Sequence, residues 1–258
     1  MSTQQPLIEA RGLSLSYAGR SVLRGVDLSV QPGELVSVLG PSGSGKSTLL
    51  RIIAGLLKPT SGHVLVDGAP LDGPRPDVAL AFQDPCLLPW LSVERNVGFG
   101  LGFSRQPSLT RGERRDRVTA ALDEVGLAHA RTYMPRQLSG GMAQRTALAR
   151  CLTRQPRALL LDEPFGALDE ITRADMQRLL LKVVQDTHAG TVLVTHDIDE
   201  ALLVSDRIVL LGAQGSLIAQ WRVTVSAPRA AEVQALGALR IEILQALQDS
   251  MARGKNAA

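Results

Sequence analysis

The residues best suited to chemistry in this chain lie in a glycine-rich segment, GPSGSGKS, at residues 40–47. It follows the apolar stretch ELVSVLG and precedes KSTLLRIIAGLL, which has the pattern of a helix ended by Gly55 and Pro59. Glycines allow backbone N–H groups to converge on phosphate oxygens, and a helix N-terminus adds partial positive charge. A glycine-rich turn without a ligand is the alternative, but the flanking strand and helix favour a phosphate-binding loop.

The side chains of this loop suit a nucleoside triphosphate with Mg²⁺. Lys46 can reach the β- and γ-phosphates, and the Ser47 hydroxyl is a suitable ligand for Mg²⁺. The residues expected to bind the nucleotide here are Gly40, Pro41, Ser42, Gly43, Ser44, Gly45, Lys46, Ser47 and Thr48. The loop therefore predicts phosphoryl-transfer chemistry in which Lys46 takes part.

An acidic pair in the segment ALLLDE provides the second part of the predicted site. An apolar strand that ends at Asp162 places a carboxylate at the carboxyl edge of a sheet, where open α/β sheets bind ligands. Asp162 would hold Mg²⁺, mostly through water, and Glu163 would orient or deprotonate the water that attacks the γ-phosphate. The alternative is that the two acids only cap the following helix.

Three isolated residues complete this prediction. Gln83 ends a strand in AFQD, where its amide can contact Mg²⁺ and the attacking water, although a loop glutamine alone has little meaning. His196 ends the strand TVLVTH and is expected to contact the γ-phosphate, although a lone histidine at a strand end is usually structural. Tyr17 belongs to the few aromatic residues, 3% of the chain, and can stack on adenine; core packing is the alternative.

A second phosphate-type segment, LSGGMAQR, lies at residues 138–145 and is called the signature segment below. Ser139 can cap the following helix, and Gly140 and Gly141 expose backbone N–H groups. One nucleotide already fills the first loop, and the helical stretch between them would hold the second loop away from it. We therefore expect a two-fold pair of chains, in which each Ser139 loop covers the γ-phosphate bound to the Lys46 loop of the other copy.

The elements that must position these residues follow from apolar periodicity. Strands are predicted at residues 7–30, interrupted by a turn at Ala18–Gly19, and at residues 34–40, 63–68, 78–83, 158–162, 191–196 and 207–211. Residues 84–155 have helical periodicity and no strand pattern, and the run RGERRDR is expected to be a solvated helix face. A further helix is expected to bury a face made of Met176, Leu180, Val183 and Val184.

Short apolar strands that alternate with helices indicate a parallel sheet covered on both sides. The predicted fold is α/β, a RecA-like P-loop NTPase core with an N-terminal antiparallel β subdomain and an inserted helical subdomain at about residues 86–156. The ATPase domain is expected to span residues 1–228. Residues 229–258 should form a helical tail that packs on it through Val233, Leu236, Leu239, Ile243 and Leu247.

Composition excludes several other classes of protein. The chain has 258 residues, mean hydropathy +0.07 and a net charge of +3 with Lys and Arg spread along it, which argues against nucleic-acid binding. Cys86 and Cys151 are far apart and form no metal spacing, which is typical of a reducing compartment. We expect no secretory signal and no segment able to span a bilayer.

The combination of motifs resembles the ATP-binding cassette (ABC) transporter ATPases over about residues 7–225. GPSGSGKS is similar to the Walker A motif of that family, AFQD to its Q-loop, LSGGMAQR to its signature, ALLLDE to its Walker B, GALD to its D-loop and THD to its switch histidine. The resemblance implies ATP and Mg²⁺ as ligands, and it adds Asp169 of the D-loop to the nucleotide site. Met142 departs from the usual glutamine of the signature, and we have no physical account of it.

Finer features resemble the importer ATPases for aliphatic sulfonates, taurine and nitrate. These are FQDPCLLPWLSVERNVGFGL, LDEPFGALDEITRADMQ and THDIDEALLVSDRIVLL, with aliphatic sulfonates favoured by the region around VSAPR; a generic turn around Pro89 is the alternative for LLPWLSVERNV. The resemblance implies two transmembrane permease subunits, an extracytoplasmic binding protein and a peripheral location on the cytoplasmic face of the inner membrane. An exporter partner, or a soluble regulatory or assembly ATPase, remains a different class of function. The long coiled coils of DNA-repair relatives and the paired cassettes of translation-associated relatives are not indicated by this sequence.

Overall fold

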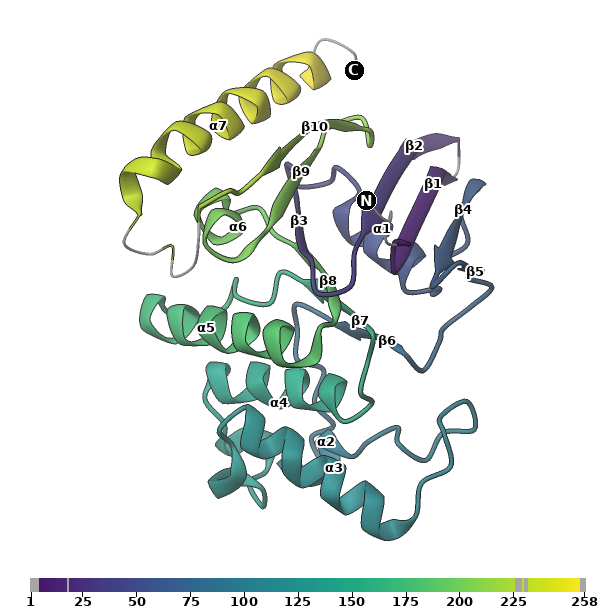
Figure 1. The fold of residues 1–258 in the computed structure, drawn as a ribbon, viewed down its shortest axis with the longest axis vertical. Coiled ribbons are helices and arrows are strands. Elements are labelled where there is room, and N and C mark those ends of the chain that lie inside the picture. Colours follow the sequence, from purple (N-terminus) through teal and green to yellow (C-terminus); the bar gives the residue numbers. More distant parts are fainter. Residues whose placement is uncertain (1–4, 18, 226–228, 230–231, 256–258) are drawn as a thin grey trace. The chain divides into compact units, whose positions relative to one another are not determined.

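The computed structural model describes residues 5–17, 19–225, 229 and 232–255, and these form two compact units. Unit 1 comprises residues 1–74 and 190–258, and unit 2 comprises residues 75–189. Figure 1 labels the helices and strands of both units. The predicted division at residue 228 into an ATPase domain and a tail stays a prediction.

Unit 1 contains two groups of strands and three helices within its described residues. Its elements are β1 (Ile8–Tyr17), β2 (Arg20–Val30), β3 (Leu35–Leu39), α1 (Lys46–Ile53), β4 (Ser61–Val66), β5 (Ala69–Pro70), β8 (Gly190–Val194), α6 (Ile198–Val204), β9 (Arg207–Leu211), β10 (Leu217–Arg222) and α7 (Val233–Lys255). The antiparallel order β2-β1-β4-β5 matches the predicted N-terminal β subdomain. In the second group β3 pairs in parallel with both β8 and β9, while β10 runs antiparallel to β9.

The central strands of unit 1 are buried, as continuous apolar strands of a parallel sheet are expected to be. Every residue of β3 and of β8 is buried, and α1 and α6 contact β8 and β3 respectively. Helix α1 ends as its sequence predicts, because Gly55 has φ 72° and the amide of Leu56 donates to the carbonyl of Arg51 at 2.9 Å. This is the Schellman motif, in which a left-handed glycine satisfies the last carbonyls of a helix.

Within unit 1 the C-terminal helix α7 contacts α6 (Figure 1), and it packs through the face that the sequence predicts. Ile243 is fully buried and Leu236 nearly so, in a cluster with Leu202 of α6 and Ile208 of β9. The partly buried residues Leu239 and Leu247 pack against the same cluster, whereas the side chain of Val233 lies outside the described residues.

Unit 2 consists mainly of helices, with one pair of parallel strands. Its elements are β6 (Val78–Ala81), α2 (Val93–Val97), α3 (Arg111–Glu124), the 3₁₀ turns η1 (Ala128–Ala130) and η2 (Pro135–Gln137), α4 (Gly140–Leu152), β7 (Ala158–Asp162) and α5 (Glu170–Thr187). Helix α4 contacts α2, α3 and α5, and it lies between α3 and α5 in Figure 1. The predicted helix face of Met176, Leu180, Val183 and Val184 is buried on α5, and residues 111–116 of α3 are exposed as expected.

Several boundaries differ from the prediction, each for a local reason. Strand β4 ends at Val66 because Asp67 and Gly68 adopt left-handed conformations, with φ 56° and 74°, and turn the chain into β5. Strand β6 ends at Ala81, so Gln83 lies beyond the strand, and its carbonyl accepts from a side chain of α4 instead of a neighbouring strand. Strand β8 likewise ends at Val194, because the chain turns there into α6.

Strand β10 is absent from the prediction. Its residues alternate between partly buried and exposed positions, which gives a weaker apolar signal than the continuous strands. A turn closed by the amide of Gly212, which donates to the carbonyl of Ser216 at 2.9 Å, folds β10 back on β9. The sequence signal for this hairpin is a glycine, Gly212, followed by the alternating stretch SLIAQWR, and the prediction missed it.

Candidate functional site

The glycine loop of unit 1 has a backbone that other residues cannot easily adopt. Gly43 and Gly45 have φ values of 79° and 100°, in the left-handed region that favours glycine. A Cβ atom on Gly45 would lie 2.9 Å from the carbonyl oxygen of Val22 and 2.8 Å from Cδ2 of Leu23. The loop therefore approaches β2 as closely as a backbone without a side chain allows, and it leads directly into α1.

Lys46 and Ser44 make this loop suitable for an anion. Lys46 is buried, and its ammonium group donates to the carbonyl oxygens of Gly40 at 2.8 Å and Pro41 at 3.0 Å, which holds the positive charge over the loop. The Ser44 hydroxyl is buried and has no hydrogen-bonding partner among the described residues. A buried hydroxyl normally has a partner, so this group fits a loop built to donate to phosphate oxygens. Ser47 stands in the first turn of α1, where a magnesium ligand is expected.

The remaining loop residues of the prediction occupy the same stretch. Ser42 is exposed, and Thr48 is half-buried in α1. Together, the loop and the N-terminus of α1 form one continuous phosphate-type cradle within unit 1.

His196 lies in unit 1 on a turn between β8 and α6. Its side chain is exposed, while the preceding Thr195 is buried and donates to the carboxylate of Glu200 at 2.7 Å. The amide of Asp197 donates to the Thr195 hydroxyl at 3.0 Å, and the Asp197 carboxylate caps α6. The imidazole is thus carried on a turn that is fixed by a buried pair, which argues against a packing role for His196 itself.

Tyr17 also lies in unit 1, at the end of β1. Its side chain is 79% exposed, so core packing does not explain it. An exposed aromatic ring of this kind is available to stack on a base.

Unit 2 places Glu163 of the acidic pair and Gln83 beside the same glycine. Asp162 ends β7 and is buried, and Glu163 follows it with φ 45°. A left-handed conformation costs a non-glycine residue roughly 1–2 kcal/mol and is concentrated at functional sites. A Cβ atom placed on Gly166 would lie 3.9 Å from both Gln83 Nε2 and Glu163 Oε2, so the two side chains approach the same small glycine.

The acidic pair does not cap the next helix. Helix α5 begins after Asp169, whose carboxylate accepts from the amide of Thr172 at 3.1 Å and from its hydroxyl at 2.6 Å. These two hydrogen bonds lower the pKa of Asp169. The capping interpretation of Asp162 and Glu163 is therefore wrong, and Asp169 has a helix-capping role within its own chain.

The signature segment forms the N-terminus of α4 in unit 2. Ser139 caps the helix, and its hydroxyl accepts from the amide of Met142 at 3.3 Å, as the sequence predicts. Gly140 is exposed, whereas Gly141 packs so tightly that a Cβ atom would overlap the methyl group of Thr172. The signature segment therefore presents the N-terminus of α4 at the surface of unit 2. The contact with α5 requires a glycine at position 141.

The sequence analysis missed Gln144, the residue that joins the helix of the signature segment to the loop that carries Gln83. Gln144 of α4 is 4% exposed, and its amide donates to the main-chain carbonyl of Gln83 at 2.7 Å. A polar residue one turn into a helix that begins at a phosphate-type segment was the available signal. Its partner lies 61 residues away and could not be identified from local pattern.

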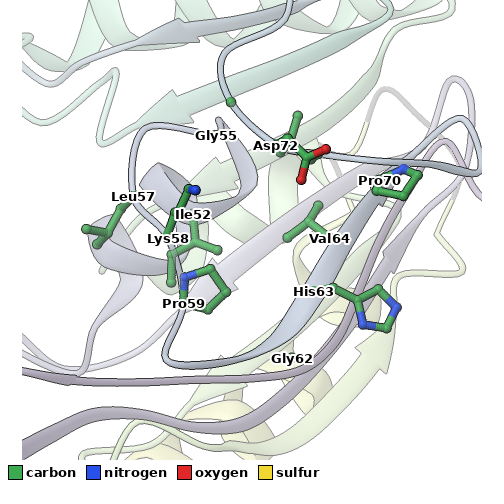
Figure 2. A pocket seen from close by; sticks show the side chains of 12 residues that line it. Ile52, Gly55, Leu57, Lys58, Pro59, Gly62, His63, Val64, Pro70 and Asp72 are labelled. Carbon is green, nitrogen blue, oxygen red and sulfur yellow. The ribbon is translucent and has the colours of Figure 1, made fainter.

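A pocket in unit 1 does not coincide with the predicted site. It has a volume of about 220 Å³ and lies where the loop after α1 meets β4 and β5. Figure 2 shows the side chains of Ile52 and Val64 in it and those of Lys58, His63 and Asp72 around it. None of the residues predicted to bind nucleotide lines this pocket.

The described helices include no segment of the length and hydropathy that crossing a bilayer requires. The glycine loop on a buried parallel strand, its lysine and the acidic end of β7 define a P-loop nucleoside triphosphatase. The family model described as ABC transporter matches residues 23–166, so the chain belongs to that family. It is therefore an ATPase that binds ATP. The α/β fold class that the sequence predicts is confirmed.

Relatives with assigned names cover nearly the whole chain. An aliphatic sulfonates import ATP-binding protein of Burkholderia lata is 47% identical over 248 residues, which are 96% of this chain and 88% of the relative. A protein of the same description from Xanthomonas axonopodis pv. citri is also 47% identical, over 93% of this chain and 98% of the relative.

Solved structures agree with the assignment to the ABC family. The ATP-binding cassette MJ0796, in a dimeric post-hydrolysis state with ADP and Pi, has a TM-score of 0.75 and 33% identity, and covers 85% of this chain and all of its own. The protein cbiO1 of Clostridium perfringens, part of the ABC transporter complex cbiONQ, has a TM-score of 0.79 and 30% identity. That comparison covers 95% of this chain and 99% of the relative.

Proposed function

We propose that the chain is the ATP-hydrolysing subunit of an importer of aliphatic sulfonates. The observation that carries this proposal is the 47% identity to aliphatic sulfonates import ATP-binding proteins over nearly the full length of both chains. Two copies of the chain would bind to two permease subunits on the cytoplasmic face of the inner membrane. An extracytoplasmic binding protein would deliver the substrate.

In this mechanism the loop and the acidic pair act on the same ATP molecule. Lys46 neutralises the β- and γ-phosphates from the loop where its ammonium group is already held. Glu163 orients or deprotonates the attacking water, with the amide of Gln83 beside it, and His196 donates to the γ-phosphate. Tyr17 stacks on adenine.

Mg²⁺ fits the remaining oxygen ligands. Ser47, Gln83 and Asp162 offer a hydroxyl, an amide oxygen and a carboxylate, the hard donors that Mg²⁺ prefers. Bound there, Mg²⁺ would supply charge neutralisation on the phosphates.

The signature segment supplies the second half of each site across a two-fold pair. Ser139, Gly140 and Gly141 of one copy cover the γ-phosphate on the Lys46 loop of the other, and Asp169 lies nearby at the start of α5. MJ0796, which this chain resembles, is dimeric in a post-hydrolysis state bound to ADP and Pi. ATP then favours the closed pair and hydrolysis the open pair. Transport then requires that the closed and open pairs each prefer a different conformation of the permease.

The permease is proposed to dock on exposed aromatic residues of unit 2 that follow, in sequence, the loop at residues 83–86. Trp90 is 70% exposed and Tyr133 is 39% exposed. Their segments are joined by a hydrogen bond in which the amide of Val93 donates to the carbonyl of Tyr133 at 2.8 Å. Exposed aromatic side chains on neighbouring segments are typical anchors of a protein interface.

Glu163→Gln tests the assignment of the chemistry. The variant should bind ATP normally, lose at least about 100-fold in hydrolysis, and accumulate as an ATP-bound dimer in sedimentation. Glu170→Gln, an exposed residue of the first turn of α5, is the matched control and should hydrolyse ATP normally. Normal turnover of Glu163→Gln would remove that residue from the proposed role.

The substrate is tested separately by growth. A deletion strain should fail to grow with aliphatic sulfonates as the sole sulfur source, and the wild-type gene should restore growth. Growth defects on taurine or nitrate alone would instead assign the importer to one of those substrates.

A further inference from the structure

Helix α4 holds the main chain of the loop that carries Gln83. The side-chain amide of Gln144 donates to the Gln83 carbonyl at 2.7 Å. Arg150 donates to the carbonyls of Pro85 at 2.7 Å and Cys86 at 2.9 Å. Three carbonyl groups within four residues therefore accept hydrogen bonds from a single helix, which attaches the loop to α4.

The loop itself has a fixed turn that directs these carbonyls. The amide of Cys86 donates to the carboxylate of Asp84 at 2.7 Å, and Cys86 has φ 47°. A side chain that bonds the backbone two residues ahead forms a tight local turn. The loop at residues 83–86 is thus a defined shape docked on α4 and not an independent strap.

Gln144 stands between two parts of the proposed site. It lies in the second turn of α4, which begins at the signature segment, and it is 4% exposed. Gln144 holds Gln83, whose side-chain amide and the Glu163 carboxylate would each lie 3.9 Å from a Cβ atom on Gly166. A displacement of α4 that preserves the 2.7 Å hydrogen bond must therefore also displace the main chain of Gln83.

We propose that Gln144 is a positioning residue that couples the signature segment to the Gln83–Glu163 pair of the same chain. When the signature segment binds the nucleotide on a second copy, the Gln144 hydrogen bond transmits the position of α4 to the residues that orient water at the chain's own nucleotide. Each copy thereby hydrolyses ATP in response to the site that it completes on the other copy. This inference rests on the proposed function, and Gln144 itself touches no nucleotide.

The test compares Gln144→Leu with Gln144→Glu in the full chain. Gln144→Leu should lower kcat for ATP hydrolysis about tenfold, the effect of one lost hydrogen bond, and should lower the Hill coefficient for ATP toward one. The affinity of the monomer for ATP should stay unchanged, because the glycine loop is untouched. A change in ATP affinity equal to the loss in kcat would overturn the coupling role.

Gln144→Glu keeps the length of the side chain and removes its hydrogen-bond donor. A carboxylate accepts hydrogen bonds and cannot donate to the Gln83 carbonyl. The Hill coefficient of this variant should therefore fall toward one, as in Gln144→Leu, while the affinity of the monomer for ATP stays unchanged.

The controls distinguish failure of this inference from failure of the proposed function. Gln177→Leu replaces another buried glutamine, on α5, and should keep the wild-type Hill coefficient. If Gln144→Leu keeps wild-type kcat while Glu163→Gln is inactive, the coupling is wrong and the proposed function stands. Should Gln144→Leu fail to fold, as judged by circular dichroism, the Hill coefficient of Gln144→Glu decides, and a wild-type Hill coefficient in that variant overturns the proposal.

Discussion

The helix cap at Ser139 allows its structural role to be separated from its proposed role in the second copy's site. The Ser139 hydroxyl accepts from the amide of Met142 at 3.3 Å, and the Ser92 hydroxyl caps α2 in the same way, accepting from the amide of Arg95 at 3.4 Å. Loss of either cap in a Ser→Ala variant should cost about 1 kcal/mol of stability. The two variants are therefore matched as helix caps, and only Ser139 is proposed to contact phosphate.

The expected effect on ATP-driven dimerisation is much larger for Ser139→Ala. A hydrogen bond to a charged group contributes about 1.5–3 kcal/mol, and a two-fold dimer contains two of them. Their loss should weaken the dimer by about 3–6 kcal/mol, which raises its dissociation constant roughly 10²- to 10⁴-fold. Ser92→Ala should leave the dissociation constant unchanged within about twofold.

Analytical ultracentrifugation with ATP measures this difference when both variants are made in a Glu163→Gln background, where hydrolysis does not dissolve the dimer. Thermal unfolding of each variant measures the cost of the lost cap. The reasoning is refuted if Ser139→Ala shifts the dimer dissociation constant no further than Ser92→Ala does. In that outcome the hydroxyl only caps α4, and the signature segment does not bind phosphate through it.

Three further predictions follow from local geometry. Gly45→Ala should lower the free energy of unfolding by about 3 kcal/mol, because of backbone strain and the contact with Val22. Gly43→Ala, with open space around it, should lower it by only about 1 kcal/mol, and urea denaturation measures both. Ile243→Ala should cost roughly 2–5 kcal/mol, because it opens a cavity under α7. Cys151, whose burial raises the pKa of its thiol to about 11, should not react with a thiol reagent at about pH 8 in the native protein, whereas it should react in denaturant.

Each of these predictions has a simple contradiction. Equal losses of stability in the two glycine variants would show that the close approach to β2 is not limiting. Ile241, which is 56% exposed on the same helix, is the control for Ile243, and an equal loss at both positions would contradict the burial of one face. Rapid modification of native Cys151 would show that α4 opens locally, while the exposed Cys86 serves as the internal reference thiol.

Elements whose residues are contiguous could be predicted from the sequence. The strand β7 has the predicted bounds, and Ser139 caps α4 as the motif indicates. The stripe containing Leu236 and Ile243 also faces the core as expected, because a periodic apolar pattern determines which side of a helix must be buried. These features depend on interactions between residues close in sequence, so a single sequence is enough to predict them.

The features that the prediction missed depend on contacts between distant segments. The end of β6 was placed too late because the carbonyl of Gln83 bonds to Gln144 and not to a strand. The helix-capping alternative for Asp162 and Glu163 could be rejected only when Asp169 was seen to cap α5. Neither observation leaves a periodic or compositional trace.

The sequence by itself determined the class of this protein. The glycine loop with Lys46, the strand that ends at Asp162 and the signature segment each require particular residue types at fixed spacing, because phosphate recognition uses consecutive backbone groups. The tertiary structure decided which side chains support that chemistry. Gln144 holding Gln83 joins residues 61 apart in the chain, and only packing of α4 against the loop brings donor and acceptor within 2.7 Å.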